Sequence, residues 1–289
     1  MINFYLSAIL LGLGFASLAI GIFISMRIFN IPDITTDGTF TLGGAITAVL
    51  ISSAWNSWLI LPFVFILGAF AGAITGLIHT RLKVNALLSG ILVMTALYSI
   101  NLAIMGRSTI PLVNLPTLFS SFSVFQNTIL QQLTVLILFI FVLWLLVSWL
   151  LKTDFGIAMR ATGNNETMIR AYGVNTKNMK TIGLAIANGF TAMSGFLITQ
   201  IQGFSDINMG IGVVILGLGS VMIGEIVLKL FRITSIRIHL LGVIGGSILF
   251  RMILAFALSI GIDALYLKLV VAVFVLIVVS IPNFKTAND

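Results

Sequence analysis

Long apolar runs separated by short polar stretches dominate this sequence and restrict what it can fold into. A run of about 18 or more apolar residues can cross the ~30 Å hydrocarbon layer of a bilayer as one helix. A shorter run, from 42 to about 55, either crosses the membrane or re-enters it. The sequence therefore predicts an all-α, polytopic transmembrane protein with about 8–9 spans, one of them broken or re-entrant. The predicted full spans are 5–26, 58–79, 86–105, 129–151, 181–201, 211–230, 240–262 and 265–281.

The composition agrees with a membrane protein and excludes a soluble globule. Of 289 residues, 59% are hydrophobic and 8% are charged, which leaves too little polar surface to cover a soluble fold. The longest polar interruptions, 107–127 and 152–180, are too short to form an independent core. We therefore expect a single transmembrane domain over 1–289, with 152–180 as a polar hairpin within it. No basic stretch precedes the first run, which argues against a cleaved signal peptide.

Lysine and arginine collect on the cytoplasmic side of membrane proteins, and they predict an orientation here. If the polar hairpin is cytoplasmic and every predicted segment crosses, the N-terminus lies outside and the C-terminus inside. Arg107 and Lys268 then lie toward the outside, and Arg251 lies within a span. This bias accounts for the net charge of +7 without a nucleic-acid partner. The basic residues on the predicted cytoplasmic side are Arg27, Arg81, Lys83, Lys152, Arg160, Arg170, Lys177, Lys180, Lys229, Arg232, Arg237 and Lys285.

Capping signals predict a short helix inside the polar hairpin. Asn164 is a suitable N-cap, and Glu166 follows in the first turn, where the helix dipole favours an anion. Glu166 and Arg170 stand four residues apart in the favourable order for an ion pair. Gly173 fits the left-handed position that ends a helix. These signals therefore predict a short helix between two turns of the hairpin.

The same hairpin leads directly into a predicted span. Asn175 or Thr176 can cap a helix that runs on through Lys180 into the span that begins near 181. Met168, Ile169 and Tyr172 add apolar surface to the short helix, a mixture suited to a partner's groove. A merely solvated loop is the alternative, and the residues alone leave both possibilities open.

Three blocks of sequence resemble one protein family. They are "FNIPDITTDGTFTLGGAITAVL" at Phe29–Leu50, "HTRLKVNALLSGILVMTALYSINLAIMGR" at His79–Arg107, and "GNNETMIRAYGVNTKNMK" followed by "ANGFTAMSGFL". In this order the blocks resemble the permease subunits of bacterial ABC importers, in the branched-chain amino acid and ribose group. The second block is most similar to permeases of the tryptophan/tyrosine type of uptake system.

The resemblance implies a transport function and a set of partners. The chain would sit in the bacterial plasma membrane as one of two permease copies, with ABC ATPase subunits that bind ATP and Mg²⁺ and an external substrate-binding protein or lipoprotein. By this resemblance its cargo would be an amino acid, and the similarity to the tryptophan/tyrosine type implies an aromatic one. The short helix would be the coupling helix held by the ATPase subunit. Its predicted coupling residues are Asn164, Asn165, Glu166, Met168, Ile169, Arg170, Tyr172 and Gly173.

The chain carries no motif for chemistry of its own. It has no G-x-x-x-x-G-K-[ST] loop for ATP phosphates and no H-E-x-x-H metal motif. It has no cysteine, and its two histidines, His79 and His239, stand far apart at span ends. We therefore expect no catalytic residue, no bound metal and no cofactor in this chain. An ion-gradient-driven secondary transporter is the alternative function, and it would need a buried carboxylate.

Polar residues within or beside the spans are the candidate transport pathway. Pro32 interrupts helix formation in "NIPDITTDGT", and polar backbone at membrane depth must face protein or a water-filled cavity. An ordinary interfacial turn is the alternative there. Arg251, within a span, is costly unless it faces a partner or cavity, whereas Glu225 can pair with Lys229. The outer loop 107–127 is a possible platform for a binding protein. The predicted pathway residues are Asp33, Thr35, Thr36, Asp37, Asn85, Tyr98, Asn101, Asp206 and Arg251.

Two stretches of the chain echo each other weakly. When 30–47 is laid over 203–220, Asp33 falls on Asp206 and Gly44 on Gly217. Each stretch follows one predicted span and opens the next, but from opposite sides of the membrane. The echo therefore suggests an inverted repeat of the kind that transporters build around broken helices.

Overall fold

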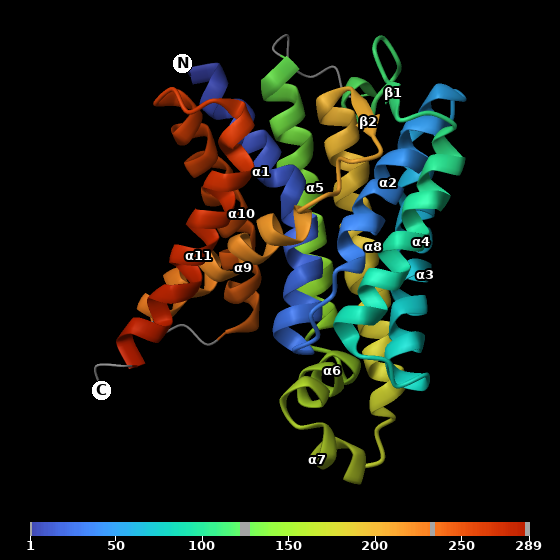
Figure 1. Cartoon of the computed structure of the whole chain (residues 1–289), viewed down its shortest axis with the longest axis vertical. Helices are drawn as coiled ribbons and strands as arrows, with labels where there is room; N and C mark the ends of the chain where they lie inside the picture. The colour runs from blue at the N-terminus through green and yellow to red at the C-terminus, as the bar shows by residue number, and fades with distance from the viewer. Residues whose placement is uncertain (1, 122–127, 232–234, 287–289) are drawn as a thin grey trace.

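The computed structural model describes residues 2–121, 128–231 and 235–286, and within these ranges the chain is a helical bundle (Figure 1). A helical hairpin of α6 and α7 extends beyond one end of the bundle, whereas the N-terminus and a two-stranded sheet lie at the other end. The elements are α1 Ile2–Ile22 with the π-helix η1 Phe23–Ile28, α2 Thr35–Ser52, α3 Ser57–Arg81, α4 Ala86–Met105, β1 Thr109–Pro111, η2 Leu118–Ser121, α5 Thr128–Leu150, α6 Asp154–Asn164, α7 Glu166–Ala171, α8 Thr176–Gln202, β2 Phe204–Asp206, α9 Val213–Leu230, α10 Ile236–Ser259, η3 Ala264–Tyr266 and α11 Leu267–Thr286.

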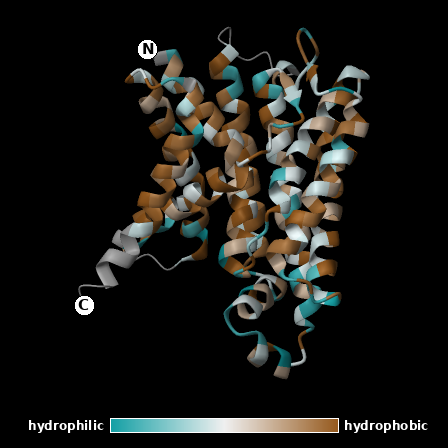
Figure 2. Ribbon diagram, viewed as in Figure 1, coloured by the Kyte–Doolittle hydropathy of each residue, from teal (hydrophilic) through white to brown (hydrophobic). Residues whose placement is uncertain are grey.

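The helices confirm the predicted polytopic membrane fold. Among the described residues, six helical segments are long and apolar enough to cross a bilayer: Asn3–Ile28, Ser57–Arg81, Ala86–Met105, Thr128–Leu150, Thr176–Gln202 and Ile236–Ser259. Figure 2 shows hydrophobic residues along the bundle, while hydrophilic residues gather at its ends and on the α6–α7 hairpin. The described helix ends that carry the predicted cytoplasmic basic residues lie at the hairpin end (Figure 1). Arg232 falls outside the described residues.

The second predicted segment is a complete helix that starts earlier than expected. The prediction began it at 42, but α2 begins at Thr35, so Thr36 and Asp37 are helical rather than part of an unwound stretch. Because these residues are polar, the search for apolar runs missed the first part of the helix. In Figure 1, α2 begins between the two ends of the bundle and runs to the end where α3 starts. The non-helical stretch 29–34 joins α1 to this internal starting point, so the segment is a broken span.

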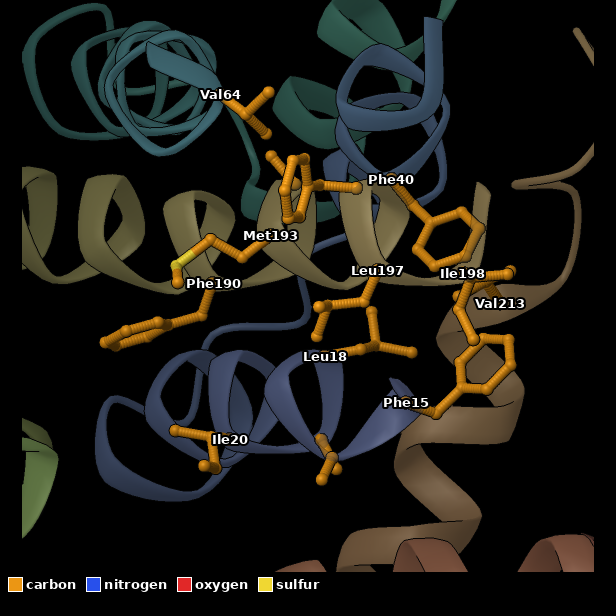
Figure 3. Close-up of a cluster of buried hydrophobic side chains, with 14 of the residues drawn as sticks. Phe15, Leu18, Ile20, Phe40, Val64, Phe190, Met193, Leu197, Ile198 and Val213 are labelled. Atoms are coloured by element: carbon orange, nitrogen blue, oxygen red, sulfur yellow. The ribbon is translucent and has the colours of Figure 1, made fainter. Parts of the chain in front are cut away.

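α8 is the centre of the packing, and small residues let its neighbours approach closely. A Cβ added at Gly43 of α2 would lie 2.0 Å from the carbonyl oxygen of Ala192, and one at Gly21 of α1 would lie 2.4 Å from that of Ala187. At these positions glycine lets α1 and α2 approach α8 closely. Figure 3 shows the side chains around α8: Phe190, Met193, Leu197 and Ile198 from α8, Phe15, Leu18 and Ile20 from α1, Phe40 from α2, Val64 from α3 and Val213 from α9.

Equivalent residues of the two echoing stretches are separated by 173 positions, the same separation as between Ser17 and Phe190. Asn30 and Gly203 both adopt positive φ, 55° and 76°, where each preceding helix has ended. Asp33 and Asp206 each accept a hydrogen bond from the backbone N–H two residues further on, at 2.9 Å in both cases. The two stretches therefore share local geometry that the weak sequence match alone does not establish.

The helices around these stretches obey the same relation. The Ser17 hydroxyl donates to the carbonyl oxygen of Phe190 at 2.7 Å, so this hydrogen bond joins two positions that the 173-residue shift relates. Thr47 and Ser220, also related by the shift, each donate to the carbonyl oxygen four residues earlier. In Figure 1, α1 and α8 run in opposite directions, as do α2 and α9, and both α2 and α9 begin between the bundle ends. The structure thus supports an inverted repeat with two broken spans.

Candidate transport and coupling sites

The hairpin has the predicted short helix, but its cap lies one residue later than predicted. Asn164 is the last residue of α6, and Asn165, with extended backbone, accepts a hydrogen bond from the Met168 N–H at 3.0 Å. The first of two adjacent asparagines was the wrong choice because α6 continues through it. Gly173 has φ of 84°, as predicted for the residue that ends the helix. Asn175 caps α8, accepting from the Asn178 N–H at 3.2 Å.

Glu166 fastens α7 to the start of α8. One carboxylate oxygen accepts from Arg170 at 2.7 Å and from the Thr176 hydroxyl at 3.0 Å, and the other is bonded by Lys180. The hydrogen bond from Lys180 is the main cause that lowers the pKa of Glu166 below its ordinary value. Glu166 therefore positions the short helix on the long helix that enters the membrane, and most of its hydrogen-bonding capacity is used within the chain.

The outer surface of α7 carries exposed apolar side chains. Met168 is 50% exposed and Tyr172 is 77% exposed, whereas Ile169 is half-buried. α7 contributes no buried residue to the fold. The helix is thus held by polar contacts on one side and presents Met168 and Tyr172 on its free surface.

The hairpin touches the broken span directly. A Cβ added at Gly163 of α6 would lie 1.6 Å from the carbonyl oxygen of Ile28, so the backbones of α6 and η1 are in closest contact there. The Asn30 side-chain amide donates to the carbonyl oxygen of Gly163 at 3.2 Å. Phe29 packs against Gly183 of α8 in the same region. The hairpin therefore contacts the chain at the point where η1 ends and the non-helical stretch begins.

The polar residues after the break form an internal network. Asp33 is fully buried and accepts from the Asn188 amide of α8 at 2.6 Å, while the Asn188 oxygen accepts from the Thr39 hydroxyl at 2.8 Å. The hydroxyls of Thr35 and Thr75 of α3 are 2.8 Å apart, and the Thr36 hydroxyl donates to the carbonyl oxygen of Asp33. Of the two environments that polar backbone at this depth can occupy, protein contact is the one observed.

Asp37 joins the starts of the two broken helices. Its carboxylate accepts from the backbone N–H groups of Gly212 and Val214, both at 2.8 Å, and so caps the N-terminus of α9. The neighbouring turn of α2 is also fixed, because the buried Asn101 amide donates to the carbonyl oxygen of Gly38 at 3.1 Å. The first turn of α2 therefore connects α9 and α4.

Some predicted residues lie apart from these clusters. Asn85 caps α4, accepting from the Leu87 N–H at 2.9 Å in an exposed position, and Tyr98 of α4 is 48% exposed. Among the described residues, neither side chain is hydrogen-bonded to the network around Asp33. Glu225 forms an ion pair, but its partner is Arg27 of η1 at 2.5 Å and not Lys229 as predicted, because the tertiary fold brings η1 beside α9.

Arg251 and Asp206 line one cavity of about 350 Å³. The Arg251 guanidinium lies 3.9 Å from the centre of the Phe15 ring, and that ring stacks on Phe40 with centroids 5.6 Å apart. Asp206 is held in β2 and accepts from the Thr109 hydroxyl at 2.6 Å. The other residues around the cavity are Ile198, Gln202, Phe204, Asn208, Met209, Ile211, Val213 and Leu216.

The histidines serve as local anchors. His79 Nδ1 is 2.9 Å from the carbonyl oxygen of Val84, and His239 Nδ1 is 2.9 Å from that of Ser235. Within the described ranges, no group of three or more His, Cys, Asp or Glu residues is arranged to hold a metal ion. The outer loop contributes β1 and η2, but 122–127 of the predicted binding-protein platform lie outside the described residues.

Two oppositely directed broken helices within a multi-pass bundle are an arrangement that occurs in transport proteins. The chain belongs to the family described as branched-chain amino acid transport system permease component, whose model matches residues 3–280. It is the permease subunit of an ABC importer in the bacterial inner membrane. This membership decides against the ion-gradient-driven alternative.

Curated relatives agree with the family. The chain is 36% identical over 268 residues to a tyrosine transport system permease protein of Clostridioides difficile, covering 93% of this chain and 88% of the relative. It is 34% identical to an uncharacterised protein of Rickettsia prowazekii, over 96% and 97% of the two chains. It is 24% identical to the ribose import permease RbsC of Haemophilus influenzae, over 72% and 64%. No solved structure gives a significant match.

Proposed function

We propose that this permease imports an amino acid, with tyrosine or a related aromatic amino acid as cargo. The proposal follows from the 36% identity with a tyrosine transport permease over nearly the whole chain. It works as a dimer of two permease copies, receives cargo from an external binding protein, and takes its energy from separate ATPase subunits that bind ATP and Mg²⁺. The chain itself makes and breaks no covalent bond.

The observation that carries the mechanism is the contact between the hairpin and the broken span. The ATPase subunit holds the exposed surface of α7, where Met168 and Tyr172 offer apolar contact. Closure of the ATPase pair moves α7, and Glu166 transmits the movement to α8. The Gly163–Ile28 contact transmits it to the end of α1. α8 and the end of α1 therefore move at the same time as α7.

The movement reaches the middle of the bundle through polar connections. The stretch 29–34 leads to Asp33, which is bonded to α8, and α2 continues to Asp37, which is bonded to α9. Because packed helices shift between discrete arrangements, a push at the hairpin end favours one arrangement of the two broken spans over the other. These arrangements correspond to the outward-open and inward-open states of alternating access.

Reconstituted uptake tests this function. Proteoliposomes with the permease, its ATPase subunits and binding protein should accumulate labelled L-tyrosine only with ATP. Met168→Ala combined with Tyr172→Ala should abolish uptake without unfolding the chain, because both side chains are exposed. Leu265→Ala, at a position 84% exposed on the other end of the bundle, is the matched control and should retain uptake. Uptake by the permease alone under an ion gradient would refute the proposal.

A further inference from the structure

The cavity beside Arg251 has two opposite charges that are not paired with each other. Among the residues that the structure describes, Arg251 has no hydrogen-bond or ion-pair partner, and its contact is the face of the Phe15 ring. A buried or half-buried guanidinium is costly in a membrane unless an anion or polar group compensates it. The Phe15 ring compensates part of this cost and fixes the guanidinium, but it leaves the N–H donors at the guanidinium edge available.

Asp206 has remaining capacity on another part of the same cavity wall. Its two oxygens accept from the Thr109 hydroxyl and from the Asn208 N–H, and pairing of β1 with β2 holds its backbone. A carboxylate has about four lone-pair sites, so two of these acceptors remain for a ligand. No described basic side chain lies within ion-pair distance of it. The cavity therefore offers a fixed cation and a fixed anion with donor and acceptor capacity to spare.

The rest of the lining is mostly apolar and aromatic. Phe15 and Phe40 form a stacked pair, and Ile198, Met209 and Leu216 complete an apolar wall. A volume of about 350 Å³ is at the lower end of the range for small-molecule sites, ~300–1,000 Å³. The cavity runs from the β2 end of the bundle to Val213, where α9 begins between the bundle ends. This is the region where transporters with inverted repeats bind their cargo.

We propose that this cavity binds a zwitterionic amino acid with an apolar or aromatic side chain during import. The cargo carboxylate pairs with the Arg251 guanidinium, the ammonium group faces Asp206, and the side chain contacts the apolar wall of Phe40, Ile198 and Leu216. Phe15 is a positioning residue, because it acts through Arg251. The inference rests on the proposed amino-acid import and assigns the residues that recognise the cargo backbone within the permease.

The natural absence of cysteine allows a direct test by protection from labelling. Ile211, in the turn before α9, lines the cavity and is 54% exposed, whereas Ile215, in the first turn of α9, is 39% exposed and is not among the cavity-lining residues. In the permease–ATPase complex in nanodiscs, L-phenylalanine should slow thiosulfonate labelling of the Ile211→Cys variant severalfold. Labelling of the Ile215→Cys variant should not change. Equal effects on both variants would overturn the proposed site.

Analogues and charge variants separate the two polar contacts. Phenethylamine lacks the carboxylate and 3-phenylpropionate lacks the ammonium group, so each should protect about tenfold less well than the amino acid. Arg251→Gln in the Ile211→Cys background should remove protection, Arg251→Lys should keep part of it, and the exposed control Lys268→Gln should keep all of it. If the Arg251→Gln variant fails to assemble, the comparison of analogues on the unchanged cavity still tests whether the carboxylate and the ammonium group are recognised. Protection that is indifferent to the carboxylate would refute the pairing with Arg251.

Failure of this inference can be told from failure of the proposed function. ATP-driven amino-acid uptake with the same KM in the Arg251→Gln variant, and no protection at Ile211→Cys, would remove the cavity from the pathway but leave the import function intact. Protection without any ATP-driven uptake would leave the site and remove the proposed function.

Discussion

The contact between Gly163 and Ile28 makes a quantitative prediction about coupling. In Gly163→Ala, the new Cβ would lie 1.6 Å from the Ile28 carbonyl oxygen, whereas ordinary van der Waals contact begins near 3.4 Å. Neither atom belongs to a flexible side chain, so α6 has to move away from the end of α1 by about 1.5–2 Å. The movement also lengthens the 3.2 Å hydrogen bond from Asn30 to Gly163.

The displaced hairpin should still bind the ATPase but transmit less of its movement. Coupling free energies between sites are typically about 1–3 kcal/mol, so losing this contact should lower solute transport per ATP hydrolysed by about 5–150-fold. The assay is the ratio of labelled tyrosine imported to ATP hydrolysed in proteoliposomes. ATP hydrolysis itself should persist, because α7 and Glu166 are unchanged.

A matched glycine gives the control. Gly245 of α10 has no atom within 4 Å of the position of an added Cβ, so Gly245→Ala should leave the transport ratio unchanged. The substitution also favours the helix by up to about 1 kcal/mol, as it does at position 163. If Gly163→Ala transports with the same ratio as Gly245→Ala, the hairpin does not act through the end of α1.

Three further predictions concern polar contacts. Asp37→Asn should lower the free energy of unfolding by about 1–3 kcal/mol, because it weakens the cap on α9. In thermal unfolding in detergent, this variant should have a lower Tm than the control variant Asp263→Asn, whose substitution lies at an exposed turn. Asn188→Leu should destabilise the fold by about 2 kcal/mol or more by leaving Asp33 short of a donor, and Asp33→Asn should recover part of that loss. The partners of Glu166 lower the pKa of its carboxyl group below 4.5, so the ionised carboxylate should stabilise α7 fully at neutral pH. This stabilisation should fall only as the pH drops below 4.5, and hydrogen exchange of residues 166–172 as a function of pH measures it. If one of these changes leaves stability unaltered, the corresponding contact does not contribute as proposed.

The sequence predicted the hairpin well because capping is a local property. Asn165, Glu166 and Gly173 act through backbone groups within a few residues, so their pattern is readable without the fold. The error between Asn164 and Asn165 arose because two adjacent residues satisfy the same local rule. The choice depends on where α6 ends, and the last turn of α6 packs on Ile28, far away in the sequence.

The sequence could not predict the connections across the bundle. Asp37 was predicted to lie in an unwound stretch, but it lies in the first turn of α2 and its carboxylate caps α9, 175 residues away for Gly212. Asn188 received no role, although an amide inside an apolar span was a usable signal, since buried polar groups need partners. Glu225 was assigned to Lys229 by helical spacing, whereas tertiary contact gives it Arg27. Local rules cannot choose among partners that only packing brings together.

The weak repeat was the hardest feature to judge from residues alone. Few identities connect 30–47 with 203–220, because each copy packs against different neighbours and its side chains differ accordingly. The conserved elements are backbone features, the positive φ of Asn30 and Gly203 and the turns at Asp33 and Asp206. Many sequences can adopt such backbone features, so the similarity of the two stretches is clearer in the structure than in the amino-acid sequence.

Cross-linking from the surface of α7 tests the central claim most directly. Since the chain has no cysteine of its own, Tyr172→Cys places one reactive thiol on the hairpin, and Val113→Cys, at a position 73% exposed, places one near the opposite end. With a short bifunctional reagent in the assembled transporter, the Tyr172→Cys variant should cross-link to the ATPase subunit and the Val113→Cys variant should not. A cross-link to the ATPase from Val113→Cys, or none from Tyr172→Cys, would contradict the account.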